Sequence, residues 1–174
     1  MKKIILLIVY IILSFNIYSQ EKESYRGCDI FLDLDYLDSI PIYNRLNTSI
    51  VGFVKHDTIN DNYVKFKLLE KNSQAFYVDV YYSLDEDSII ATGWINKSIH
   101  LGVFSRAYDR PLILYKEPSE KSAIICIEQY NPKMYVVLDF YNRWLKIKTI
   151  IDEKLFCGWI PPEMQCANVY STCS

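Results

Sequence analysis

The sequence predicts an all-β protein made of two small tandem units that follow a leader for export. Three observations support this prediction: an N-terminal segment typical of a signal peptide, a composition rich in strand-forming residues, and a Gly-Trp-Ile tripeptide that occurs twice. The chain contains 15 tyrosines and 8 phenylalanines. Aromatic and β-branched residues fit a pleated, half-buried surface, so this composition favours strands.

The first 19 residues have the three regions of a secretory signal peptide. Two lysines precede an apolar run from Ile4 to Phe15, and small or polar residues continue to Ser19 and Gln20. The apolar run is shorter than the roughly 20 residues that cross a bilayer. We therefore expect an exported protein, periplasmic or extracellular, with no membrane span once the leader is cleaved.

The cysteines agree with export, because disulfides form in oxidising compartments. Cys166 and Cys173 lie close together in a polar tail, "CANVYSTC", and we predict a disulfide between them. Cys28, Cys126 and Cys157 have no assigned partner. Since the chain has five cysteines, at least one thiol stays free or pairs with another molecule.

Short alternating stretches follow one another along the chain and predict its strands. The clearest are Tyr63–Leu68, Phe76–Tyr82 and Trp144–Ile150, each next to a turn-rich segment such as "NDN" or "DEK". No convincing helical period longer than two turns occurs outside the leader. The stretch Ser105–Arg110 is predicted to be a single helical turn or an irregular linker.

The repeated tripeptide, Gly93–Ile95 and Gly158–Ile160, divides the mature chain into two units. Aligning the units places residues 75–78 over 144–147. We expect the tripeptide isoleucines in the cores, the tryptophans at the rims, and each glycine at a sharp bend or a close backbone contact. The predicted organisation is signal peptide 1–19, extension 20–39, first unit 40–104, linker 105–111 and second unit 112–174.

An equivalent position follows each tripeptide. Leu101 and Cys166 both lie seven residues after the tripeptide tryptophan. If this position closes a small core, the second unit carries a cysteine there, and Cys173 can staple it. Small cores benefit from such staples.

Each unit resembles a bacterial SH3-like domain, a small five-stranded barrel. The shared marks are an early strand ending in an apolar residue and Tyr, the stretch "WLKI" at Trp144–Ile147, a hairpin, and Gly-Trp-Ile before a short closing turn. The first unit departs from the pattern with Ala75 in place of the tryptophan. The resemblance implies two SH3-like five-stranded barrels in tandem, and the tail "C-x-N-x-Y-x-T-C" is similar to those of small exported Bacteroidetes proteins without assigned function.

Nothing in the sequence predicts catalysis. His56 and His100 lie outside any nucleophile or metal motif, and no C-x-x-C occurs, so we expect no enzyme activity, no cofactor and no metal. The acidic stretches "DLDYLDS" and "LDEDS" lack the ligand spacing of a calcium loop. A net charge of −2 gives no reason to expect nucleic acid as a partner.

The remaining hypothesis is a binding module. Tyr135, Tyr141 and Trp144 surround one predicted hairpin, together with Phe140, and tyrosine and tryptophan stack on sugars or grip peptides. The resemblance adds Pro161, which corresponds to the proline of a peptide groove, although Met164 replaces the groove tyrosine. We expect an exported, non-catalytic module that recognises peptidoglycan peptides or an envelope protein. The alternative is an inhibitor or immunity-type protein that neutralises an envelope-acting toxin or enzyme; barrel packing alone also explains the aromatics.

Overall fold

The computed structural model describes residues 27–45, 49–106, 110–171 and 173. The predicted signal peptide and residues 107–109 of the predicted linker lie outside the described residues. Within the part that is described, no helix is long and apolar enough to cross a membrane.

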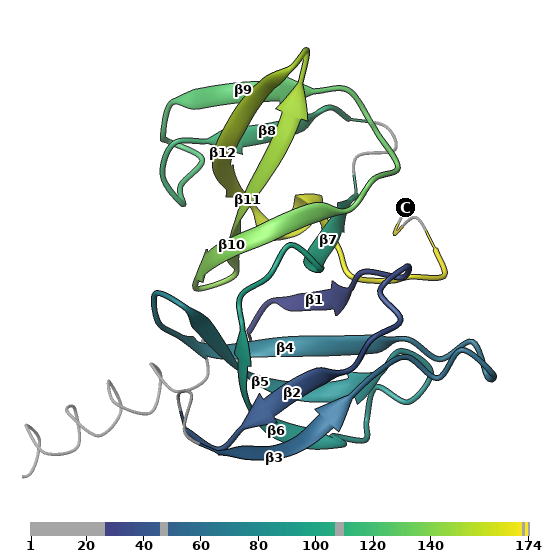
Figure 1. Ribbon diagram of the computed structural model, residues 1–174. Coiled ribbons are helices and arrows are strands. Elements are labelled where there is room, and N and C mark those ends of the chain that lie inside the picture. Colours follow the sequence, from purple (N-terminus) through teal and green to yellow (C-terminus); the bar gives the residue numbers. More distant parts are fainter. Residues whose placement is uncertain (1–26, 46–48, 107–109, 172, 174) are drawn as a thin grey trace, which may run out of the picture.

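Strands make up nearly all of the regular structure (Figure 1), which confirms the all-β prediction. The first half of the chain forms β1 (Asp29–Leu32), β2 (Ile40–Tyr43), β3 (Ile50–Val54), β4 (Val64–Lys71), β5 (Ala75–Tyr82), β6 (Ala91–Asn96) and β7 (Leu101–Ser105). The second half forms β8 (Leu112–Tyr115), β9 (Ile124–Glu128), β10 (Tyr135–Tyr141), β11 (Trp144–Ile151), β12 (Lys154–Ile160), the 3₁₀ turn η1 (Pro162–Met164) and β13 (Gln165–Cys166).

These strands pair into one continuous, open antiparallel sheet rather than into two separate closed barrels. The order is β3-β2-β6-β5-β4-β1-β7-β10-β11-β12-β8-β9, and β13 adds to β7 outside this path. In Figure 1 the strands of the two halves form an upper and a lower lobe, which meet where β1, β7 and β10 lie. Strand β1 falls within the predicted N-terminal extension, so part of this extension belongs to the sheet.

The pairing repeats with a period of six strands. The first set runs β3-β2-β6-β5-β4-β1-β7, and the second runs β9-β8-β12-β11-β10-β7-β13. Strand β7 therefore belongs to both sets: it closes the first, against β1, and opens the second, where β13 pairs with it. We call these two sets the first repeat and the second repeat.

Strand registers agree with the alignment of the two units. Phe76 pairs with Ile95 in the first repeat, and Leu145 pairs with Ile160 in the second. The register shifts within β4 and β10, and within β2 and β8, also fall at equivalent places. The repeat predicted from a tripeptide is thus present in the pairing of the whole sheet.

Both cores are built from the inward-facing residues of these strands. Ile95 and Ile160 are fully buried, as predicted, and so are Leu101 and Cys166 at the two equivalent closing positions. Trp94 is half-buried, whereas Trp159 is buried. Strands β3 and β9 are mostly exposed and contribute one core side chain each, Val54 and Cys126.

The tripeptide glycines are required because another backbone approaches them. A Cβ at Gly93 would lie 2.8 Å from the carbonyl oxygen of Tyr43, and one at Gly158 would lie 3.1 Å from that of Tyr115. No described glycine has a positive φ. Of the two predicted reasons for these glycines, close approach is therefore the one that applies.

Candidate functional site

The predicted contact residues Tyr141 and Trp144 face each other at the end of the β10–β11 hairpin. Tyr141 is 55% exposed. Trp144 is half-buried, and its ring meets that of Tyr115 edge to face, with 5.6 Å between the centroids. These two side chains reach solvent on the second repeat.

The other predicted contacts are packed inside. Tyr135 is 1% exposed, and Pro161 is also buried. Phe140, from the same hairpin, is buried too and stacks against Phe76 of the first repeat, with 6.0 Å between the ring centroids. Tyr135, Pro161 and Phe140 are therefore buried. Of the predicted contact residues, Tyr141 and Trp144 remain accessible at the surface.

A hollow of about 490 Å³ lies between the repeats next to this hairpin. Leu68, Glu70 and Tyr77 line it from the first repeat, and Phe140 and Asn142 line it from the second. It is a junction between packed strands, and the exposed hairpin forms one side.

A second candidate site lies at the C-terminal tail, where strand pairing and a disulfide define its geometry. After η1 the chain turns back along β7, where Gln165 pairs with Ser105 and Cys166 with Phe104. The predicted disulfide between Cys166 and Cys173 is present, with 5.7 Å between the Cα atoms. It closes a short loop that stands beside β7.

One hydrogen bond within this loop and two to other segments of the chain hold it in place. The side-chain oxygen of Asn168 accepts a hydrogen bond from the backbone N–H of Tyr170, at 2.9 Å. The Tyr170 hydroxyl donates to the carbonyl of Asp61, at 2.6 Å, and its ring lies 5.8 Å from that of Tyr63. Arg106 Nε donates to the carbonyl of Cys173, at 2.6 Å. The described part of the tail is therefore held by contacts at Tyr170 and Cys173.

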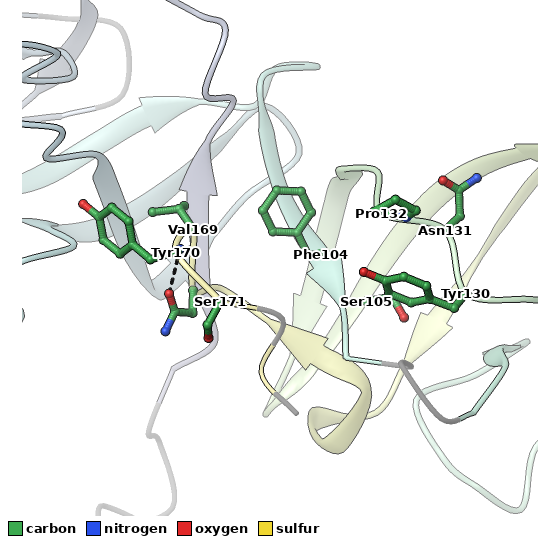
Figure 2. Close-up of a pocket in the computed structure, with 9 residues that line it drawn as sticks. Phe104, Ser105, Tyr130, Asn131, Pro132, Val169, Tyr170 and Ser171 are labelled. Carbon is green, nitrogen blue, oxygen red and sulfur yellow. Dashed lines mark hydrogen bonds between the residues drawn. The ribbon is translucent and has the colours of Figure 1, made fainter.

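Between this tail and the β9–β10 loop lies a hollow of about 270 Å³, which we call the tail hollow. Figure 2 shows Phe104 on β7 between Tyr170 on the tail and Pro132 on the loop. The described residues that line it are Phe104, Ser105, Tyr130, Asn131, Pro132, Asn168, Val169, Tyr170 and Ser171. The Phe104 ring packs against that of Phe31 on β1, with 4.5 Å between the ring centroids.

The lining is apolar and uncharged. Aromatic rings, a proline and a valine supply the walls, and side-chain amides and hydroxyls stand among them. Burial raises the pKa of Tyr170, so its hydroxyl remains a neutral donor at physiological pH. The described lining residues offer apolar contact and a few hydrogen bonds from amides and hydroxyls, as many ligand-binding pockets do.

The described residues include no group of three His, Cys, Asp or Glu side chains that could hold a metal ion. The two histidines have structural contacts. His56 is buried, its Nδ1 accepts the N–H of Val64 at 3.0 Å, and its Nε2 lies 3.0 Å from the carbonyl of Asp33. His100 stacks on Tyr36 at the edge of the first repeat.

Sequence reasoning found the disulfide but not the hollow beside it. Tyr130 and Pro132 stand in "QYNPKM", where Asn-Pro signals a turn and nothing more. Phe104 comes from β7, some 60 residues before the tail. A local pattern cannot indicate that these three segments meet, because the pairing of β13 with β7 brings them together.

Comparisons with known proteins leave the family open. No family model matches the chain, and no curated protein matches it. The structure of NlpC2 from Trichomonas vaginalis is similar over 81% of this chain and 48% of its own, at 15% identity and a TM-score of 0.34. This chain thus spans about half of that protein, and a likeness of this size carries no argument about function.

Proposed function

We propose that this protein is an exported, non-catalytic binding module of two SH3-like repeats, and that the tail hollow binds a peptide of a cell-envelope component. The observation that carries the proposal is the lining of the tail hollow. Aromatic rings and a proline form its walls beside amide groups, and its described residues include no carboxylate, imidazole, amine or thiol.

A peptide suits this lining better than a charged small molecule does. Aromatic and proline side chains pack against apolar side chains and aliphatic backbone, and the Asn131 and Asn168 amides can exchange hydrogen bonds with peptide groups. The hollow has room for one or two residues, so the peptide is a short segment of something larger. Because the disulfide and the Tyr170 contacts hold the tail wall in place, binding costs little free energy for ordering that wall.

Two features support the SH3-like assignment. Each repeat has the hairpin, the Gly-Trp-Ile strand and a short turn before the closing strand, and in the second repeat this turn is η1. The closing strands β7 and β13 pair with the opening strands β1 and β7. Export is supported by the disulfide, since disulfides are rare in reducing compartments.

Sedimentation with purified peptidoglycan tests the wall ligand. We expect the mature protein to co-pellet at micromolar concentration, and binding to fall when the stem peptides are removed enzymatically. Tyr130→Ala should weaken binding, whereas Phe53→Ala, an exposed aromatic on the far edge strand β3, should leave it unchanged. Absence of co-pelleting would contradict the peptidoglycan ligand.

Tyr141→Ala separates the tail hollow from the hairpin. If the hairpin is the contact surface, this variant loses binding and Tyr130→Ala does not, and the assignment of the ligand to the tail hollow is then wrong. If the tail hollow binds, the order reverses. Both side chains are tyrosines on the second repeat, so the two changes are chemically matched.

A further inference from the structure

A row of paired side chains crosses the outer face of the second repeat. Asp139 on β10 pairs with Lys146 on β11, Lys146 pairs with Trp159 on β12, and Trp159 pairs with Tyr115 on β8. Residues directly opposite each other on neighbouring strands point to the same face of a sheet. Asp139, Lys146 and Trp159 are therefore neighbours on one surface.

Two lysines of the first repeat reach this row. Lys71, at the end of β4, places its Nζ 2.8 Å from Oδ1 of Asp139, and the Nζ of Lys97, after β6, lies 3.6 Å from the same oxygen. Lys71 and Lys146 also both lie over the ring of Trp159, at 6.0 and 5.8 Å from its centroid. Two ammonium groups thus contact the Asp139 carboxylate, and that of Lys146 shares the Trp159 ring with Lys71. We call these three lysines, which come from both repeats, the basic cluster.

One carboxylate leaves the basic cluster with an excess of positive charge. Oδ1 of Asp139 already accepts the backbone N–H of Phe140, at 2.9 Å, in addition to its two lysine contacts. The side chain of Lys97 is only 19% exposed, so water screens it poorly. Burial lowers the pKa of Lys97, Asp139 opposes this, and the nearby Lys71 lowers it further. Repulsion among the ammonium groups therefore remains in the folded protein.

We propose that the basic cluster, Lys71, Lys97 and Lys146, binds a small oxyanion group, a carboxylate or a phosphate. Ammonium groups are compact charges with three donors each, and both oxyanions accept hydrogen bonds from them. An arriving anion neutralises the excess charge that Asp139 leaves. The basic cluster shares no residue with the tail hollow, so this proposal is independent of the proposed function.

A purely structural ion pair does not account for the arrangement. To join the repeats, one ammonium facing Asp139 is sufficient, and Lys71 provides it at 2.8 Å. Lys97 and Lys146 add further positive charge beside it, in a chain whose formal net charge is −2. Asp139 orients Lys71 and Lys97, and the N–H donors of the three ammonium groups that it does not use are available to an anion.

The test is titration of the mature protein with sodium phosphate and, separately, with sodium acetate, followed by NMR at constant ionic strength in chloride. We expect saturable shifts of the Trp159 indole and of the backbone around Asp139. Lys97→Met and Lys71→Met should each weaken the affinity by about tenfold, the size of one lost charge-assisted contact. Lys148→Met, two residues further along β11, is the matched control and should leave the affinity unchanged.

Asp139→Asn distinguishes an anion site from a structural ion pair. Removal of the internal carboxylate should tighten anion binding several-fold, and phosphate should raise the melting temperature of this variant more than that of the parent. The anion that binds with the higher affinity shows whether the ligand group is a phosphate or a carboxylate. The proposal is wrong if neither anion gives saturable shifts, or if Asp139→Asn is destabilised and phosphate restores nothing.

Discussion

The two repeats have the same frame and different outer faces. Inside, Phe76 and Leu145 occupy equivalent positions, and both pair with the isoleucine of the tripeptide. Outside, the row in the first repeat is Tyr43, Trp94, Tyr77 and Glu70, whereas in the second it is Tyr115, Trp159, Lys146 and Asp139. Core positions keep apolar residues of similar size because packing restricts them.

The differences concentrate where the repeats meet. Position 77 is a tyrosine in the first repeat, and its equivalent, Lys146, joins the basic cluster in the second. The first repeat contributes Lys71 and Lys97 to this cluster, although its own row carries no lysine. The second repeat alone ends in a stapled tail, and this tail forms the wall of the tail hollow. The tail hollow therefore depends on the tail of the second repeat, whereas the basic cluster takes lysines from both repeats.

The largest expected effect concerns a buried acid that only the second repeat carries. Glu128 is 7% exposed where the first repeat has Val54, and it accepts hydrogen bonds from Lys133, at 2.6 Å, and Thr149, at 3.0 Å. Glu128→Ala removes the acceptor of the buried Thr149 hydroxyl and leaves Lys133 only a longer contact, 3.4 Å, to the carbonyl of Ile150. We expect the free energy of unfolding to fall by about 3 kcal/mol, measured by urea denaturation.

The double variant Glu128→Val with Thr149→Val imitates the apolar interior of the first repeat. It should recover most of this loss, because both the buried acceptor and the buried hydroxyl are then replaced by apolar groups and Lys133 can turn to water. A double variant as unstable as Glu128→Ala would show that the polar network itself stabilises the second repeat.

The next effect concerns the staple. Cys173→Ser opens the loop that follows β13, and loop entropy predicts a loss of about 2–3 kcal/mol. The first repeat needs no staple, since its closing strand β7 is held on both sides, by β1 and β10. Thermal denaturation measures the loss, with Cys157→Ser as the control. An unchanged melting temperature for Cys173→Ser would mean that Tyr170 and Arg106 hold the tail without the disulfide.

The tripeptide glycines test the equivalence of the frames. An added Cβ at Gly93 would lie 2.5 Å from Cγ2 of Ile42 and 2.8 Å from the carbonyl oxygen of Tyr43. At Gly158 the contacts are slightly longer: 2.7 Å to the flexible end of Ile125, 2.8 Å to Cβ of Leu114 and 3.1 Å to the carbonyl oxygen of Tyr115. We expect Gly93→Ala to destabilise the protein by about 2 kcal/mol and Gly158→Ala by about 1 kcal/mol. Urea denaturation of both variants gives the comparison. A larger loss for Gly158→Ala would reverse the steric ranking of the two sites.

The next prediction concerns the reactivity of the three free thiols rather than the stability of the fold. Burial, followed by the nearby Asp29, raises the pKa of Cys28 to about 12, and Cys126 is also buried. Cys157 is exposed. Iodoacetamide at pH 8 should label one thiol of the native chain, Cys157, and mass spectrometry counts the labels. Rapid labelling of Cys28 would contradict its burial.

The same thiol gives a pH dependence with a defined sign. The ordinary pKa of a thiol is 9.0, and that of Cys28 in the folded chain is about 12. Between these values the unfolded chain releases this proton and the folded chain retains it, so the stability from this thiol decreases as the pH rises from 9 to 12. Cys28→Ala should show a weaker decrease over this range, measured by urea denaturation at several pH values.

Sequence reasoning reached the strands and the repeat because both are local or periodic. Alternation predicted Phe76–Tyr82 and Trp144–Ile150 as strands, and the structure places β5 and β11 there. The disulfide was predictable because its cysteines lie seven positions apart in one tail. The structure does not show two separate closed barrels, because β7 is shared between the repeats. No local sequence pattern reveals that one strand closes one unit and opens the next.

The candidate sites depend on long-range contacts. Tyr135 and Trp144 are both aromatic residues beside one predicted hairpin, yet the first is buried and the second reaches solvent. Sequence alone determined the all-β class, the repeat and the stapled tail. Strand alternation, a recurring tripeptide and the spacing of two cysteines can each be read directly from the chain. Only the tertiary structure decided that Tyr130 and Tyr170 line one hollow and that Lys97 meets Asp139, because chain segments far apart in sequence must first pack together.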